Sequence, residues 1–178
     1  MADLYTPTYV PQGDEVAVLN TSKGTIKARL DAEGAPIHVA NFCELIEKGY
    51  YDGVKFHRYV PGFVIQGGDP YTKDMTPQEV MRGGTPAHRA GTGGPGYCIK
   101  DEYKTNPRNR HNDGTLAMAR TSMPNTAGSQ FYFCLGPQHS LDSGYTVFGE
   151  TVEGLDVIKQ LRAGDEILSA TIEHVNAE

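Results

Sequence analysis

The chain has 178 residues, of which 38% are hydrophobic and 21% charged, and its formal net charge is −6 at pH 7. This length predicts one domain, residues 1–178, that buries roughly 70% of the surface of the unfolded chain. The negative charge argues against non-specific binding to nucleic acid or to an anionic membrane surface. No apolar run is long enough to predict a membrane span, so the composition is typical of a soluble globular protein.

Residues 1–14 carry neither a basic nor an apolar segment of the kind found in signal peptides, and they predict an irregular leader. We therefore expect the chain to stay in the cytoplasm, where it is made. Cys43, Cys98 and Cys134 are odd in number, widely spaced and set among apolar residues. This pattern favours free, buried thiols in a reducing compartment over a disulfide or a catalytic thiol.

Alternating apolar residues predict two strands, 16–19 and 25–30, joined by a hairpin turn. The apolar spacing over 39–46 then predicts an amphipathic helix, which begins near Pro36 and ends at Gly49. The apolar face of this helix is expected to pack on a sheet.

The stretch FHRYVPGFVIQGGD, residues 56–69, predicts two strands, 54–60 and 63–68, joined by a tight turn at Pro-Gly. Alternation places Arg58 among apolar neighbours on one face of the first strand. Burying a guanidinium is costly unless it is paired. Two interpretations fit: a structural arginine with an acidic partner or one reaching out from a sheet edge, and a guanidinium at the floor of an apolar pocket that meets a ligand.

Residues 70–90 lose periodicity and predict an inserted surface loop or specificity loop, with one short helix over 76–81. The next segment, GTGGPG at 91–96, lacks the GK[ST] of a P-loop, and no GxGxxG opens a helix there. It therefore predicts turns where two backbones approach closely.

Short elements fill the remaining chain. The expected strands are 97–99, 115–120, 129–135, 145–149 and 167–174, with a polar loop at 100–113 and a second amphipathic helix at 155–161. In the third of these strands, Phe131 and Phe133 are predicted to face the core, and Gln130 and Tyr132 to share the other face. In the last strand, Leu168, Ala170 and Ile172 are predicted to point inward. Many short strands separated by turns favour a closed barrel or a sandwich.

Three ordered blocks resemble the signatures of the cyclophilins, which are peptidyl-prolyl cis-trans isomerases. The blocks are FHRYVPGFVIQGGD, then LAMAR at 116–120 with PNTAGSQF at 124–131, and finally LD at 141–142 with VFG at 147–149. The resemblance runs from about residue 16 to about residue 175 and is closest to bacterial single-domain members. It implies a mainly β fold: an eight-stranded antiparallel β-barrel capped by two α-helices. It also implies an enzyme that rotates Xaa-Pro peptide bonds and assists protein folding.

The resemblance assigns a role to each matching position. Arg58 matches the catalytic arginine of the family, and Gln66 matches the glutamine beside it. The substrate-binding positions are the apolar walls of the proline pocket, an adjoining pocket and the segment that binds the substrate backbone: Phe63, Val64, Tyr132 and Leu141; Gln130; and Ala119, Arg120 and Thr121. Tyr145 lies where many members have histidine, and it either hydrogen-bonds the substrate or rims the pocket.

The chemistry agrees with these residue types. Rotation about an Xaa-Pro bond meets a barrier of about 18–20 kcal/mol, because amide resonance must be broken. The prolyl nitrogen of the twisted state becomes a hydrogen-bond acceptor, which a rigid, always charged guanidinium can reach. No cofactor or metal is expected, since the six histidines show no zinc-binding spacing. His57 is expected on the opposite face as a satisfied structural histidine.

This chain departs from the family pattern near the expected pocket. The family usually has Met at position 64 and Phe at 132, and often Asn at 120. Many eukaryotic members have a tryptophan beside the pocket that strengthens cyclosporin binding, whereas this chain has none. Ser140 or His139 occupies that neighbourhood, so the resemblance implies weakened affinity for cyclosporin.

Three functional hypotheses follow. The first is an isomerase acting on proline-containing peptides and unfolded proteins, expected as a monomer. The second is a proline-peptide binding or scaffold module whose turnover is incidental. The third is a non-enzymatic barrel that carries a small ligand, against which Arg58 and Gln66 argue.

Overall fold

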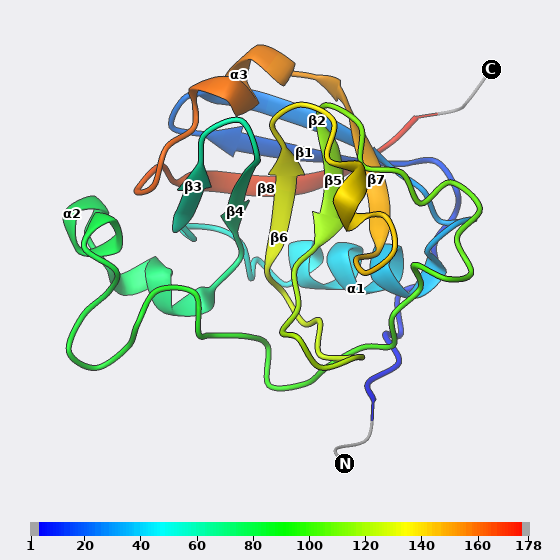
Figure 1. The fold of residues 1–178 in the computed structure, drawn as a ribbon, viewed down its shortest axis with the longest axis horizontal. Coiled ribbons are helices and arrows are strands. Elements are labelled where there is room, and N and C mark those ends of the chain that lie inside the picture. The colour runs from blue at the N-terminus through cyan, green and yellow to red at the C-terminus, as the bar shows by residue number, and fades with distance from the viewer. Residues whose placement is uncertain (1–3, 176–178) are drawn as a thin grey trace.

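The computed structural model describes residues 4–175, and its main feature is one eight-stranded antiparallel sheet (Figure 1). The strands are β1 Glu15–Thr21, β2 Gly24–Leu30, β3 Arg58–Val60, β4 Val64–Gly67, β5 Thr115–Met118, β6 Phe131–Cys134, β7 Val147–Glu153 and β8 Ile167–His174. Their spatial order is β3-β4-β6-β5-β7-β2-β1-β8, so β3 and β8 form the two ends of the sheet. The predicted mainly β architecture with eight antiparallel strands is confirmed.

The sheet curls until its two ends meet beside β3. Lys55 forms an isolated antiparallel bridge with Glu166. The amide of Phe56 donates to the carbonyl of Asp165 at 2.8 Å, and the amide of Gly164 donates to the carbonyl of Phe56 at 2.8 Å. Because these bonds pair backbone groups that an open edge would leave exposed, they close the curled sheet.

Helices lie at the two ends of the curled sheet. In Figure 1, α1 Pro36–Glu47 lies below the strands and α3 Leu155–Gln160 lies above them. Helix α1 packs against β8, and α3 packs against β2. The predicted capping of the barrel by two α-helices is therefore confirmed.

The start of α1 is capped from a distant loop. Ala35 at the N-cap offers no side-chain hydrogen bond. The buried carboxylate of Glu102 instead accepts the amides of Ile37 and His38 at 3.1 and 2.8 Å, and it also contacts Nδ1 of His38 at 2.7 Å. These bonds satisfy amide groups that a helix start leaves unpaired.

The main core fills the inside of the curled sheet. Its aromatic centre includes Phe42 of α1, which packs edge-on against Phe131 and Phe148 with ring centroids 5.5 and 5.1 Å apart. Phe131 and Phe133 are both fully buried in this core, as the alternation of β6 predicts. Cys43 and Cys134 are buried, Cys98 is half-buried, and all three are free.

Two predicted strands differ in the structure. Of the expected strand 54–60, only the part from Arg58 onward forms the strand β3. Residues 54–56 do not pair with β4, because their backbone bonds to residues 164–167 instead. In β8, the pairing with β1 shifts between Asn20 and Thr21, which leaves Leu168 as an extra residue. This β-bulge turns Leu168 outward, where it is 56% exposed, and puts Ile167 in the core.

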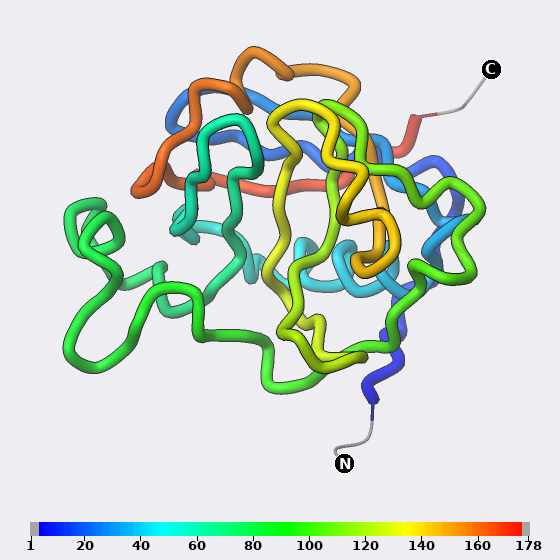
Figure 2. The backbone as a smooth tube through the Cα atoms, in the orientation of Figure 1, coloured from blue at the N-terminus to red at the C-terminus, as the bar shows by residue number. Residues whose placement is uncertain are grey.

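The segment after β4 extends away from the barrel as a green loop in Figure 2. It contains the 3-10 turn η1 Pro70–Asp74 and the short helix α2 Pro77–Met81. Thr76 accepts the amide of Glu79 at 3.1 Å, and Glu79 accepts the amide of Thr76 at 2.9 Å. This capping box explains why the helix predicted over 76–81 begins there.

Two smaller elements complete the comparison with the sequence. The expected strand 97–99 is reduced to a single bridge between Ile99 and Ala127. The expected strand 145–149 begins later, at Val147, and β7 continues to Glu153 because it pairs with both β2 and β5.

The leader has no regular secondary structure over residues 4–14, as predicted, yet it is bound to α1. Residues 1–3 of the predicted leader lie outside the described part. The buried carboxylate of Glu44 accepts the amide and hydroxyl of Thr8 at 2.8 and 2.7 Å and the hydroxyl of Tyr5 at 2.5 Å. None of the helices within residues 4–175 has the length and apolar character needed to cross a bilayer.

Candidate active site

A second apolar cluster lies on the other side of the sheet from the main core. Its buried members are Val64, Ala117, Tyr132, Cys134 and Val147, and its half-buried members are Phe63, Ala119, Leu141 and Tyr145. Strands β4, β5, β6 and β7 supply the buried members, because alternate residues of these strands face away from the main core. We call these nine residues the apolar cluster.

The apolar cluster brings together six residues that the sequence singles out: Phe63, Val64, Ala119, Tyr132, Leu141 and Tyr145. Sequence reasoning missed Ala117, Cys134 and Val147, which form its floor. Period-two alternation could have found all three, since Cys134 follows Tyr132, Val147 follows Tyr145 and Ala117 precedes Ala119, each by two residues.

A chain of polar side chains borders the apolar cluster. In the register of the sheet, Arg58 lies opposite Gln66, and Gln66 lies opposite Tyr132. Nη1 of Arg58 donates to Oε1 of Gln66 at 3.4 Å, and Nε2 of Gln66 donates to Oε1 of Gln130 at 3.1 Å. The arrangement therefore orients the Arg58 guanidinium from the neighbouring strands.

The glycine-rich segment, residues 91–96, binds the side chain of Gln130, which is the last member of this row of polar side chains. Nε2 of Gln130 donates to the carbonyls of Gly91 and Gly93 at 2.8 and 2.9 Å. The buried carboxylate of Asp69 accepts the amide of Gly91 at 2.6 Å. A Cβ atom at Gly93 would lie only 2.1 Å from a side-chain oxygen of Asp69. The close neighbour of this glycine is therefore a side chain, and not a second backbone as the sequence predicts.

Arg58 is exposed at the open rim of the apolar cluster. It takes part in none of the ion pairs found within residues 4–175, so the expected acidic partner is not observed. The expectation of a guanidinium at the pocket floor is also wrong. Strand β3 ends the sheet, so its side chains meet solvent on the side where a central strand would have a neighbour.

Arg120 follows β5 and leaves its main chain free. Neither its amide nor its carbonyl has a hydrogen-bond partner among the residues that the structure describes, although the flanking amides of Ala119 and Thr121 are bonded to Gln130 and Thr126. Free backbone groups next to an apolar cluster can pair with an extended peptide. Thr121 is exposed beside them.

A buried hydrogen-bond chain supports Tyr132 from behind, and sequence reasoning missed it. The hydroxyl of Tyr132 lies 2.8 Å from Nε2 of His111, and Nδ1 of His111 lies 2.8 Å from the Asp142 carboxylate. His111 is fully buried. It comes from the predicted polar loop, where no spacing or periodicity marks one histidine as a partner of a strand residue.

The pKa values of Asp142 and His111 determine where the protons lie in the hydrogen-bond chain that reaches Tyr132. Burial lowers the pKa of His111, against the opposing effect of the Asp142 hydrogen bond. Burial raises the pKa of Asp142, but hydrogen bonds from the amide and ring of His111 outweigh it, so the net shift of this pKa is downward. A neutral imidazole that donates from Nδ1 to the carboxylate must accept at Nε2, so the Tyr132 hydroxyl is its donor.

Three further side chains lie in or near the apolar cluster, and their surroundings describe what each can do. Burial raises the pKa of Cys134 to about 12, so its thiol is not a nucleophile at neutral pH. Tyr145 lies edge-on to Tyr132, with ring centroids 6.2 Å apart, and rims the cluster. His57 packs close to Gly91, and burial lowers its pKa. Its Nδ1 has no partner within the described chain, so the expectation of a satisfied histidine is wrong for that atom.

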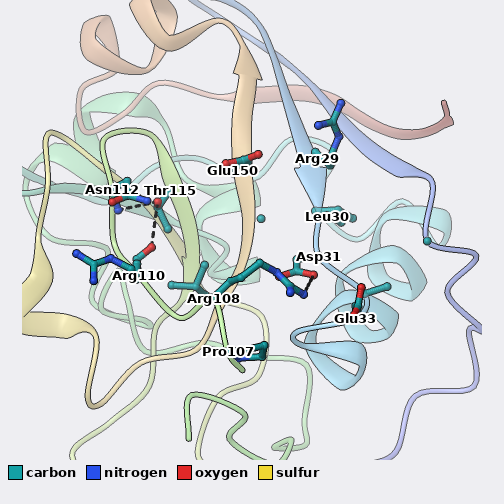
Figure 3. Close-up of a pocket in the computed structure, with 14 residues that line it drawn as sticks. Arg29, Leu30, Asp31, Glu33, Pro107, Arg108, Arg110, Asn112, Thr115 and Glu150 are labelled. Atoms are coloured by element: carbon teal, nitrogen blue, oxygen red, sulfur yellow. Dashed lines mark hydrogen bonds and ion pairs between the residues drawn. The ribbon is translucent and has the colours of Figure 1, made fainter. Parts of the chain in front are cut away.

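A separate cleft of about 560 Å³ lies over β2, β5 and β7 (Figure 3). Its lining includes Arg29, Arg110 and Glu150, and Arg108 forms a bidentate pair with Asp31 at 2.8 and 3.0 Å. In Figure 3 the side chain of Arg110 points away from that pair. The cleft has no aromatic lining residue, so it suits a pyrrolidine ring less well than the apolar cluster does.

One group of side chains resembles a metal site by composition. Asp14, Glu15 and His174 place ligand atoms within 4.8 Å of one another. The Glu15 carboxylate is buried and already accepts the Tyr9 hydroxyl and the Gln12 amide at 2.8 and 2.7 Å. His174 is bonded to Asp14 at 2.8 Å, so we assign no metal to this group.

Comparison with known proteins extends these observations. Residues 16–176 match the family model described as cyclophilin type peptidyl-prolyl cis-trans isomerase/CLD. The chain is 46% identical over 158 residues to a peptidyl-prolyl cis-trans isomerase of Synechococcus elongatus, an alignment that covers 88% of this chain and 94% of that protein. It is 41% identical over 148 residues to peptidyl-prolyl cis-trans isomerase B of Bacillus subtilis, covering 83% of this chain and 90% of the relative.

Solved structures agree with the sequence relatives. A crystal structure of a cyclophilin type peptidyl-prolyl cis-trans isomerase from Cryptosporidium parvum matches with a TM-score of 0.74 and 28% identity, covering 92% of this chain and 99% of that one. A second crystal structure of that protein, in the presence of the dipeptide Ala-Pro, matches with a TM-score of 0.73. The family model, the named relatives and the shared fold together show that this chain belongs to the cyclophilin-type peptidyl-prolyl cis-trans isomerases.

Proposed function

We propose that this isomerase rotates Xaa-Pro bonds with Arg58 as the catalytic donor and Gln66 beside it, and that the apolar cluster holds the proline ring. The observation that carries the proposal is the register of β3, β4 and β6, which sets Arg58, Gln66 and Tyr132 side by side. Arg58, which forms no ion pair with a carboxylate of residues 4–175, lies at the rim of an apolar surface, where a peptide can reach both.

The apolar cluster offers the environment that the reaction requires. Phe63, Val64, Tyr132 and Leu141 surround a surface that a pyrrolidine ring can cover, with Gln130 lining the adjoining side. Water stabilises the polar planar amide more than the twisted one, so excluding it from the bond favours rotation. The Tyr132 hydroxyl is engaged by His111, so the ring presents only apolar surface to the proline.

The polar chain gives the transition state its donor. As the bond twists, the prolyl nitrogen regains a lone pair, and a donor that meets it binds the twisted state better than either planar isomer. Oε1 of Gln66 accepts from Nη1 of Arg58 at 3.4 Å. The other N–H groups of the guanidinium remain available to the prolyl nitrogen. No proton leaves the guanidinium, since the reaction makes and breaks no covalent bond.

The substrate backbone is expected to pair with the free main chain of Arg120, between Ala119 and Thr121. This pairing fixes one side of the Xaa-Pro bond while the other side turns. Tyr145 completes the rim on that side, where it lies edge-on to Tyr132.

Exchange NMR on a proline-containing peptide tests the proposal directly. Arg58→Ala is expected to lower the isomerisation rate by about 10²- to 10³-fold, the usual effect of removing one transition-state donor. Arg29→Ala, an exposed arginine in the separate cleft, serves as the matched control and keeps the wild-type rate. Full activity of Arg58→Ala would refute the assignment, and a wild-type protein that binds peptide without turnover would favour a binding or scaffold module instead.

The same proposal covers the partners and location of the protein. The partners are proline-containing peptides and unfolded proteins, bound by a monomer in the cytoplasm, where free thiols such as the three cysteines persist. Cyclosporin is expected to be a weakened ligand, because the resemblance puts Ser140 or His139 where many family members have a tryptophan that adds contact area. Calorimetric titration checks this, and a low-nanomolar dissociation constant would contradict it.

A further inference from the structure

The side chain of Arg120 is held in one orientation beside the apolar cluster. Its Nε donates to the carbonyl of Gly144 at 2.7 Å. Its Nη1 donates to the carbonyls of Thr121 and Met123 at 2.9 and 3.2 Å. The N–H groups of Nη2 have no hydrogen-bond partner within residues 4–175, so the guanidinium keeps free donors.

Two aromatic rings hold the same guanidinium. Its central carbon lies 5.0 Å from the ring centroid of Tyr145 and 5.7 Å from that of Tyr103. Both distances are within the range of cation–π attraction. Because Tyr145 belongs to the apolar cluster, Arg120 is fixed at the edge of the surface proposed to bind proline.

No carboxylate of the described chain neutralises Arg120. It is absent from the ion pairs, and the acidic side chains of the nearby loops are engaged elsewhere. The Asp101 carboxylate accepts the amide of Asn125 at 2.8 Å. The Asp142 carboxylate is taken by His111 and His139 at 2.8 and 3.0 Å. A chain with a net charge of −6 thus keeps an uncompensated cation at its proposed substrate surface.

Backbone pairing brings one substrate residue next to this cation. The amide and carbonyl of Arg120 are both free, and proline itself lacks the N–H needed to pair with them. The residue that pairs with Arg120 is therefore a neighbour of the proline. In an antiparallel pair, opposite residues have their Cβ atoms about 4.5–5.5 Å apart on the same face.

We infer that Arg120 is a specificity-determining residue, which makes this isomerase prefer peptides that carry an acidic side chain at the position paired with it. This inference rests on the proposed function, because it takes the free main chain of Arg120 as the place where the substrate backbone binds. A carboxylate at that position meets the free Nη2 donors, whereas a lysine there is repelled.

Peptides that differ at one position test the preference. Three series place Glu, Gln or Lys at each of the two residues before the proline and at the residue after it. Exchange NMR gives kcat/KM and calorimetry gives the dissociation constant for wild type, Arg120→Gln, Arg120→Lys and Arg29→Gln. Arg29→Gln is the matched control, because it removes the same charge from an exposed site in the separate cleft.

The expected result is a preference for Glu over Gln of about 2- to 5-fold, with Lys weaker than Gln, at one position only. Arg120→Gln should remove this order, which is measured as the ratio of kcat/KM between peptides within one variant and so does not depend on the basal turnover of that variant. Arg120→Lys should retain part of the order, and Arg29→Gln should retain all of it. Raising the salt concentration should reduce the preference in wild type.

The two proposals fail in distinguishable ways. Equal values for Glu and Lys at all three positions, or a preference that persists in Arg120→Gln, would overturn the inference about Arg120 while neutral-peptide turnover upholds the isomerase site. If no peptide is turned over, the proposed function fails, and the order of the dissociation constants still decides whether Arg120 selects acidic residues.

Discussion

Tyr132 brings a hydroxyl group into the buried part of the apolar cluster, and the hydrogen bond to His111 satisfies it. The residue is only 4% exposed, so its hydroxyl could not rely on water. Burial raises the pKa of Tyr132 far above its ordinary value, which keeps the hydroxyl protonated at every physiological pH. A family position that usually holds phenylalanine therefore carries a tyrosine here without placing a polar group in the pocket.

Replacing Tyr132 by phenylalanine should separate the role of the hydroxyl from that of the ring. Tyr132→Phe leaves Nε2 of the buried His111 without a donor, which should lower the free energy of unfolding by about 1–3 kcal/mol. Peptide turnover should change little, because the ring remains. Urea denaturation measures the first effect and exchange NMR the second.

The control is Tyr145→Phe, since the hydroxyl of Tyr145 has no hydrogen-bond partner in the described part of the chain. It should change stability by less than about 0.5 kcal/mol. Equal stability of the two variants would show that the His111 contact contributes nothing measurable.

At the scale of single elements, α1 illustrates how a helix can depend on a distant carboxylate. Its N-cap residue Ala35 has no side-chain hydrogen-bond acceptor. The carboxylate of Glu102, in a loop far along the chain, accepts the amides at the helix start instead. The side chain of Lys55 has a similar role between the barrel closure and η1. Its Nζ donates to the carbonyl of Thr72 at 3.1 Å and lies 3.6 Å from the Glu166 carboxylate.

Removing the Glu102 carboxylate should destabilise the protein. Glu102→Ala leaves the amides of Ile37 and His38 unpaired, which should cost about 1–3 kcal/mol in the free energy of unfolding. Glu33→Ala, an exposed glutamate just before α1, is the control and should stay close to wild type. If thermal and urea unfolding show the same loss in both variants, the capping role is wrong.

Removing the ammonium of Lys55 should weaken the closure of the sheet. Lys55→Met keeps the apolar stem but leaves the carbonyls of Thr72 and Lys73 without their donor, with an expected loss of about 1–3 kcal/mol. Amide hydrogen exchange should accelerate most at residues 53–56 and 164–167. Uniform acceleration across all strands would indicate that Lys55 has no specific role in closure.

At the scale of the whole molecule, the buried carboxylate of Glu44 is one of the groups that attach the leader to the barrel. Burial by itself raises the pKa of Glu44, but hydrogen bonds from Tyr5 and Thr8 outweigh it and lower the pKa to about 2. The folded protein therefore resists protonation at a carboxylate that the unfolded chain protonates near pH 4.5.

Acid should therefore destabilise the protein in a defined window. The stabilisation from Glu44 is fully present well above pH 4.5, falls as pH decreases, and is lost near pH 2. It amounts to on the order of 3 kcal/mol. Urea unfolding between pH 7 and pH 2 measures it, and Glu44→Gln should flatten this part of the curve. A Glu44→Gln curve parallel to wild type would contradict the assignment.

The sequence alone determined the elements and their faces wherever the signal is local. Alternation separated Phe131 and Phe133 from Tyr132, and the motif around Arg58 identified the family before any geometry was known. Such signals depend on residues close together in the chain, because strand and helix periods repeat every few residues. The apolar cluster follows from the same alternation in four strands, although its floor was not recognised.

Only the tertiary structure decided how these pieces meet. Leu168 points outward because β8 bulges against β1, and Arg58 is exposed because β3 is the end of the sheet. His111 reaches Tyr132, and Glu102 caps α1, across 21 and 64 residues of chain. Contacts over such distances depend on strand order and loop paths, which no local pattern encodes, and they determine how the candidate site is supported.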